Sequence, residues 1–184
     1  MTQKLDLKTK YETEVAPALA KEFAIKNHLA VPKIAKVVVN IGAGEVAKEK
    51  QAFAKLQEDL AKITGQKPAV RLARISVAGF GIRAGMPVGL SVTLRGAKMY
   101  AFLGRLIAVV LPRLRDFRGV PLKSFDQKGN YTLGFAEHTV FPEINLEKID
   151  KPRGLEVTIV VKAGSKEKSQ KLLELLGMPF AKQE

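Results

Sequence analysis

Cysteine and tryptophan are both absent from this 184-residue chain. Without cysteine the chain has no disulfide framework and no thiolate that could act as a nucleophile or bind a metal ion. The only two histidines, His28 and His138, lie far apart, and neither an H-E-x-x-H nor a G-x-S-x-G pattern occurs. We therefore expect no catalytic residues, no metal site and no cofactor.

Long apolar stretches are missing as well. The longest aliphatic run has six residues, Leu106 to Leu111, whereas a membrane-spanning helix needs about 20. The first residues, Met1 to Asp6, are not followed by the apolar segment of a signal peptide. These absences predict a cytoplasmic protein without a membrane partner.

Acidic residues are scarce in the middle of the chain. The net charge is +13 and the sequence pI about 10.0. Between Asp59 and Asp116 there are ten lysines and arginines, seven of them arginine, and no acidic residue. Charges of one sign repel each other, and arginine suits forked contacts with phosphate. This segment indicates a surface for a polyanion, with a generally basic, soluble surface as the alternative.

Hydrophobic periodicity predicts alternating helices and strands. Apolar residues repeat every four positions from Tyr11 to Phe23, which indicates an amphipathic helix that is kinked or restarted at Pro17. Ser165 is the expected cap and Gly177 the expected end of the last helix. Further helices are expected over 53–63, 99–110 and 165–176, and strands over 34–41, 70–77, 88–94, 131–140 and 155–162.

Strands that are adjacent in sequence favour antiparallel pairing, so the predicted class is α+β. We expect a single domain over 1–184, with an antiparallel-rich sheet, helices packed on one face, and the other face open for RNA. That open face is a docking surface or an ordinary solvated surface. By strand parity it carries Lys36, Val38, Asn40, Ser91, Thr93, Arg95, Thr132 and Thr158.

One motif suggests a different class of protein. Gly42 to Ala47 follows a strand, precedes a helix and matches G-x-G-x-x-A, the outline of a dinucleotide-binding turn. No acidic residue follows where a ribose would be held, and Glu45 would place negative charge at an anion-binding helix start. A nucleotide-binding enzyme is therefore the weaker alternative. The simpler interpretation is a tight turn in which glycine permits positive φ.

Aromatic residues make up only 7% of the chain, so no row of stacking platforms for single-stranded RNA is visible. Short polar side chains with arginine suit folded RNA, which is bound through its shape, phosphates and 2′-hydroxyls. Six motifs in order then resemble one family, the bacterial large-subunit ribosomal protein five. They are Ile63–Pro68 (ITGQKP), Ser76–Phe80 (SVAGF), Val92–Gly96 (VTLRG), Pro112–Gly119 (PRLRDFRG), Gly129–Tyr131 (GNY) and Phe141–Ile144 (FPEI).

The resemblance implies a structural protein of the central protuberance that binds 5S rRNA and helps attach it to the large subunit. It also implies contacts with large-subunit rRNA, P-site tRNA, neighbouring 5S-binding ribosomal proteins, and a small-subunit head protein through a surface around 110–145. The alternative is a basic protein that binds RNA without specificity. The predicted 5S rRNA-binding residues are Lys36, Asn40, Gln66, Lys67, Ser91, Thr93 and Arg95.

The tRNA contact would lie in a glycine-rich, flexible loop at about 74–87. We expect this loop to become ordered when it binds, at an entropic cost of roughly 1–2 kcal/mol per fixed residue. This chain departs from the family pattern at Arg71, Ile75 and Gly81, and the last two make the loop less basic than in many relatives. The predicted tRNA-contacting residues are Arg74, Ser76, Gly79, Phe80 and Arg83.

Overall fold

The computed structural model describes residues 6–46, 49–115, 117–145 and 151–181. These residues form two compact units. The first unit draws on the chain up to Val37, on Arg95–Leu133 and on the chain from Thr158 onward. The second draws on Val38–Leu94 and Gly134–Val157. The single domain expected over 1–184 stays a prediction.

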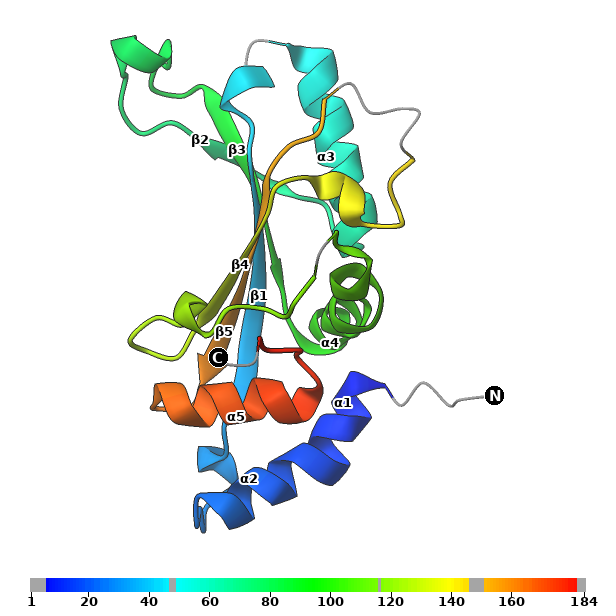
Figure 1. Ribbon diagram of the computed structural model, residues 1–184. Coiled ribbons are helices and arrows are strands. Elements are labelled where there is room, and N and C mark those ends of the chain that lie inside the picture. The colour runs from blue at the N-terminus through cyan, green and yellow to red at the C-terminus, as the bar shows by residue number, and fades with distance from the viewer. Residues whose placement is uncertain (1–5, 47–48, 116, 146–150, 182–184) are drawn as a thin grey trace. The chain divides into compact units, whose positions relative to one another are not determined.

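A five-stranded antiparallel sheet has the order β2-β3-β1-β5-β4 (Figure 1). Burial alternates along β5, where every second residue from Leu155 to Val161 is buried. That pattern has the period of a strand with one covered face. The predicted α+β class is confirmed. The strands are β1 Lys33–Gly42, β2 Ala69–Leu72, β3 Pro87–Leu94, β4 Tyr131–Phe135 and β5 Leu155–Lys162.

In the first unit, the N-terminal helix changes its geometry just before Pro17. It comprises α1 Leu7–Lys10, a π-helical turn Tyr11–Val15 and α2 Ala16–Glu22. Proline has no backbone N–H to donate to the preceding turn, and the α-helix restarts at its border. The predicted restart is confirmed, and the predicted periodicity buries Val15 and Leu19.

The other two helices of this unit follow their predicted patterns. Helix α4, Gly96–Arg105, runs into a π-helical turn Leu106–Val110 and then a short 3-10 turn that contains Pro112. Helix α5, Lys166–Leu176, begins where the hydroxyl of Ser165 accepts a hydrogen bond from the backbone N–H of Lys168. It ends at Gly177, whose φ of 102° is left-handed. Both predicted caps are confirmed.

In the second unit, α3 Lys50–Thr64 packs on β3 and buries Leu56, Leu60 and Ile63. The helix stops at Gly65, whose left-handed φ of 66° favours glycine. The glycines at and just after the end of β1 differ from Gly65, because neither Gly42 nor Gly44 has a positive φ. The expectation of a glycine-dependent turn at this point was wrong. A 3-10 turn, Gly44–Val46, follows instead.

Two strands are shorter than predicted. The strand expected over 70–77 ends at Leu72, where its register with β3 shifts, and the strand expected over 131–140 ends at Phe135. His138 therefore lies in a 3-10 turn, His138–Val140, rather than in a strand. Apolar character continues through both segments, so hydrophobicity alone did not mark where the hydrogen-bonded pairing stops.

A tight turn before β4 is held by one carboxylate. Asp126 Oδ1 accepts hydrogen bonds from the backbone N–H groups of Lys128 at 2.9 Å and Asn130 at 2.7 Å. Its Oδ2 accepts another from Asn130 Nδ2 at 2.7 Å. Desolvation raises the pKa of Asp126, but these hydrogen bonds outweigh it and the net pKa is lowered. Asn130 Oδ1 in turn accepts from the N–H of Val161 at 3.2 Å, which fixes the turn against β5.

Gly129 in this turn has a φ of 80°, and a Cβ atom there would collide with the hydroxyl oxygen of the buried Ser169. We expect Gly129→Ala to destabilise the fold by about 1–3 kcal/mol, because it combines backbone strain with a steric clash. Urea unfolding followed by circular dichroism measures this change.

Gly134→Ala is the matched control, since no atom lies within 4 Å of a Cβ at Gly134 and its φ is not positive. An equal loss of stability in the two variants would show that the turn at Gly129 imposes no special constraint.

Candidate nucleic-acid interface

Three of the predicted 5S rRNA-binding residues belong to the second unit and lie on adjoining elements. Asn40 is on β1, Thr93 is on the neighbouring β3, and Gln66 follows α3. Gln66 Nε2 donates a hydrogen bond to the backbone carbonyl of Thr93 at 3.3 Å. The hydroxyl of Thr64 donates to the carbonyl of Gln66 at 3.1 Å, which steadies the turn. Residues from two separate sequence motifs are thereby joined.

The amide of Asn40 also has a partner. Asn40 Nδ2 lies 3.4 Å from Glu156 Oε2, on the adjacent strand β5. Glu156 was not among the predicted site residues, because it is 116 positions away in the sequence. Strand parity could have found it, since it lies two positions before Thr158, which was placed on the open face.

Two further predicted residues, Lys36 and Arg95, belong to the first unit. Arg95 is exposed at the start of α4, and its Nη1 donates a hydrogen bond to the carbonyl of Ala35 at 3.1 Å. This contact holds one edge of the guanidinium against β1 and leaves its other donors available. Lys36 is half-buried on the same strand.

The remaining two predicted residues differ in solvent exposure. Lys67 is exposed in the turn after α3. Ser91 is only 6% exposed, so the expectation that it lies accessible on an open face was wrong. It pairs with Ala69 across the β2–β3 ladder, and β3 is flanked by a strand on each side. A side chain as short as serine does not reach solvent from this inner strand.

The predicted tRNA loop is an irregular hairpin with its own hydrogen bonds. Val77 and Ile82 pair through backbone bonds of 2.9 and 3.2 Å, and the hydroxyl of Ser76 accepts from the N–H of Ala84 at 2.9 Å. Gly81 and Gly85 have left-handed φ values of 62° and 85°. Glycine at 81, a departure from the family pattern, is thus suited to its backbone conformation. The mobility of this loop stays a prediction.

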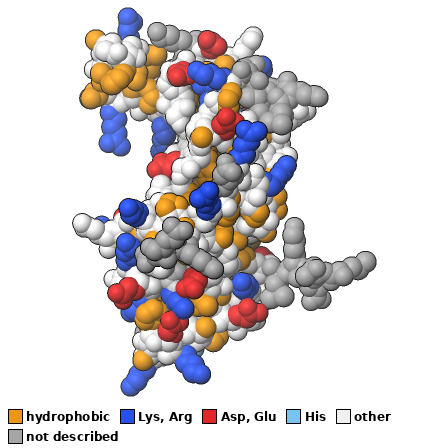
Figure 2. All heavy atoms as spheres, in the orientation of Figure 1, with side chains coloured by type: hydrophobic (Ala, Val, Ile, Leu, Met, Phe, Trp, Pro, Cys, Tyr) orange, Lys and Arg blue, Asp and Glu red, His pale blue; other side chains and the backbone are white. Residues whose placement is uncertain are grey.

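The hairpin exposes apolar side chains together with positive charge. Phe80 is 80% exposed and Ile75 70%, and the predicted contact residues Arg74, Gly79 and Arg83 are exposed too. Figure 2 shows hydrophobic side chains gathered over this hairpin, at the upper left, with lysine and arginine side chains nearby. The strand predicted over 70–77 would have covered half of its apolar residues, so the joint exposure of Val70, Leu72 and Ile75 was not predicted. The members of this apolar surface are Val70, Leu72, Ile75 and Phe80.

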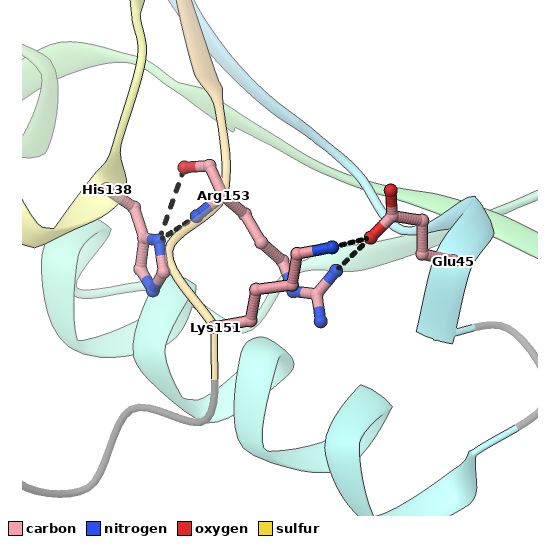
Figure 3. A network of polar contacts seen from close by, with 4 residues as sticks. All are labelled: Glu45, His138, Lys151 and Arg153. Carbon is pink, nitrogen blue, oxygen red and sulfur yellow. Dashed lines mark hydrogen bonds and ion pairs between the residues drawn. The ribbon is translucent and has the colours of Figure 1, made fainter.

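A polar network in the second unit was also missed (Figure 3). Glu45 Oε2 lies 2.8 Å from Lys151 Nζ and 3.7 Å from Arg153 Nη1. The buried His138 accepts a hydrogen bond at Nδ1 from the backbone N–H of Arg153, at 3.1 Å. His138 is therefore a structural residue, as its isolation in the sequence suggested. Glu45 and Lys151 lie 106 positions apart, so no local sequence pattern predicts their contact.

The structure around Glu45 also tests the dinucleotide-binding alternative. Glu45, Lys151, Arg153 and the glycines 42, 44 and 154 border a small hollow. Gly44 begins only a short 3-10 turn, α3 begins at Lys50, and the sheet is antiparallel. The helix N-terminus and parallel strands that bind a dinucleotide are absent from the described part of this unit.

Comparison with known proteins identifies the family of this chain. Residues 87–180 match the model of the ribosomal L5P family C-terminus, and residues 27–83 match the model described as Ribosomal protein L5. The chain belongs to the ribosomal protein uL5 family. The large ribosomal subunit protein uL5 of Rubrobacter xylanophilus is 56% identical over 95% of this chain and 97% of its own length. The uL5 proteins of Dictyoglomus thermophilum and Streptococcus pneumoniae are 56% and 52% identical, over 96% of this chain and 98% of theirs.

Membership of the uL5 family makes this chain a structural, non-enzymatic component of the large ribosomal subunit. Its partners are accordingly ribosomal RNA and ribosomal proteins. The nucleotide-binding enzyme is excluded. Among the described residues, no helix has the length and apolar character needed to span a membrane.

The Glu45 network predicts an unusual titration. The hydrogen bond and charge of Lys151 lower the pKa of Glu45, desolvation opposes them, and the charge of Arg153 adds to the lowering. A carboxylate with a lowered folded pKa stabilises the fold above its unfolded pKa, and the contribution is lost as pH falls. We expect Lys151→Ala to raise the pKa of Glu45 toward its ordinary value, measured by NMR of the glutamate carboxyl carbons.

Lys62→Ala is the control for this titration, because Lys62 pairs with Asp59 on α3 instead. An unchanged Glu45 titration in Lys151→Ala would contradict the assigned cause.

Proposed function

We propose that this uL5 chain binds 5S rRNA and helps attach it in the central protuberance of the large subunit. One observation carries the proposal: the hydrogen bond from Gln66 to the carbonyl of Thr93 unites two family motifs, ITGQKP and VTLRG, on one surface. Asn40, on the strand next to Thr93, supplies a further amide. Short amides and a hydroxyl can follow the shape and 2′-hydroxyls of a folded RNA.

Two further candidate residues, Arg95 and Lys36, belong to the first unit and carry positive charge. Arg95 is exposed and fixed at one edge by Ala35, so its other guanidinium N–H groups remain available for a forked contact with phosphate. Lys36, two positions before Val38 on β1, adds positive charge. Ser91 is omitted from this set because it is buried. Phosphate contacts fix the position of an RNA, and the amides discriminate.

We also propose that the hairpin over 74–87 contacts P-site tRNA. Its exposed Phe80 can stack on a base or ribose, while Arg74 and Arg83 supply charge. With Ile75 exposed where many relatives carry lysine, the contact depends more on apolar packing than on phosphate. At the tip, the 3-10 turn Ala78–Phe80 lies between the paired residues Val77 and Ile82.

The third proposed contact is a small-subunit head protein, reached through the surface around 110–145. Three exposed arginines, Arg113, Arg115 and Arg118, lie on its irregular part. Arginine is enriched at protein interfaces because it combines a planar charge with an apolar stem. Other 5S-binding ribosomal proteins are the expected neighbours.

A titration against labelled 5S rRNA tests the main proposal. Unrelated RNA of equal length serves as competitor, at about 50 and 200 mM salt, because binding that relies on phosphate contacts weakens steeply with salt. We expect 5S rRNA to keep a large advantage at the higher salt. Equal competition by the two RNAs, with binding lost together, would leave only the nonspecific alternative based on the +13 charge.

Two arginines separate the proposed RNA contacts. We expect Arg95→Ala to weaken 5S rRNA binding by roughly 1–3 kcal/mol, the size of a lost charge-assisted contact. Arg83→Ala removes the same charge from the hairpin and should leave 5S rRNA binding nearly intact, while tRNA contact on assembled ribosomes decreases. Equal effects of both variants in the 5S rRNA titration would refute this division of roles.

A further inference from the structure

The proposed 5S rRNA surface has a carboxylate beside Asn40. Glu156, on β5, is exposed and lies 3.4 Å from the amide nitrogen of Asn40 on β1. Among the described residues, no lysine or arginine forms an ion pair with Glu156. A negative charge without a cationic partner is unexpected on a surface that binds a polyanion, in a protein with a net charge of +13.

The hydrogen bonds already formed on this surface show which donors and acceptors remain for an RNA. Asn40 directs an N–H toward Glu156, and Gln66 directs an N–H toward the carbonyl of Thr93. Among the described residues, nothing donates a hydrogen bond to the side-chain amide oxygens of Asn40 and Gln66. The carboxylate of Glu156 has two oxygens and several acceptor sites. Acceptors therefore dominate the available groups at this point.

A phosphate group is also an acceptor and carries negative charge, so it matches this spot poorly. The donors of an RNA are its 2′-hydroxyls and the amino groups of its bases. We propose that Glu156 is a specificity-determining residue: its carboxylate repels phosphate backbone and accepts a hydrogen bond from a 2′-hydroxyl or a base amino group. Asn40 holds the carboxylate in place until an RNA donor reaches it.

This role follows from the distribution of charge. The basic segments attract any RNA, because attraction to phosphate carries no sequence information. Discrimination needs an element that an incorrectly docked RNA cannot satisfy. A carboxylate beside the amide of Asn40 is such an element, since it favours one local arrangement of the RNA and opposes contact with bare backbone. The inference rests on the proposed binding of 5S rRNA to this surface.

The test compares Glu156→Ala, Glu156→Gln and wild-type full-length protein in titrations with 5S rRNA and with unrelated RNA of equal length. Glu58→Gln is the control, because Glu58 is exposed on α3 and its substitution changes the net charge equally. Circular dichroism confirms that each variant is folded. The measured quantity is the ratio of the dissociation constants for unrelated RNA and 5S rRNA.

We expect Glu156→Ala to lower this ratio by about tenfold or more, because a charged acceptor is lost as well as the repulsion. Glu156→Gln keeps the shape and one acceptor oxygen but removes the charge. It should strengthen binding of unrelated RNA by roughly two- to tenfold, the effect of one charge a few ångströms from a phosphate in water. Glu58→Gln should leave the ratio within about twofold of wild type, since a distant exposed charge is screened.

The outcomes separate this inference from the proposed function. If wild-type protein shows no preference for 5S rRNA, the proposed function fails, and the inference fails with it. If wild-type protein prefers 5S rRNA and Glu156→Ala retains the full preference, the inference alone is wrong. The same conclusion follows if Glu58→Gln changes the ratio as much as Glu156→Gln does.

A modified RNA then identifies the donor. A 5S transcript with 2′-fluoro groups in place of its 2′-hydroxyls keeps its bases but lacks the hydroxyl donors. If Glu156→Ala no longer weakens binding of this transcript, the carboxylate accepts from a 2′-hydroxyl. If the full effect persists, it accepts from a base amino group. The comparison is a cycle that isolates one pairwise contact.

Discussion

Strand register is the constraint on which the rest of this structure depends. Along β5 the side chains of Leu155, Val157, Ile159 and Val161 are buried, and the positions between them point the other way. A slip of one residue would exchange the two sets. Burial of the aliphatic set therefore also fixes Glu156 beside Asn40 and Thr158 beside Thr132, where the two threonine hydroxyls lie 3.1 Å apart. The hydrophobic effect thus positions the polar groups proposed to contact RNA.

Prediction from sequence succeeded where a feature depends on neighbouring residues. The bounds of β5, the cap at Ser165 and the end of α5 at Gly177 follow from local patterns and were confirmed. It failed where a feature depends on distant partners. Hydrophobicity does not reveal where pairing stops, so the strand thought to include His138 was too long. Strand parity assigns a side chain to one face of the sheet but does not give its solvent exposure, so the buried Ser91 was placed on an accessible surface.

The candidate site shows the same division. Strand parity and the family resemblance named Asn40, Gln66, Thr93 and Arg95. Only the folded chain shows that Gln66 and Thr93 are joined and that Asn40 meets a carboxylate. Glu156 and the Glu45 network escaped notice because each joins positions more than a hundred residues apart. Composition correctly indicated a large net positive charge. The specificity for RNA proposed here depends instead on one negatively charged residue, Glu156.

The hairpin beyond β2 has a consequence for the protein before it is assembled. Strand β2 is the outermost strand of the sheet, and Val70, Leu72 and Ile75 are exposed on or beside it. An unpaired apolar edge can pair with the same edge of another copy. Arg71 and Arg74 oppose this by mutual repulsion, which salt screens. Rising ionic strength therefore weakens the binding of this protein to RNA and also favours its self-association. The chain is thus most prone to aggregate at the high salt concentrations that release it from RNA.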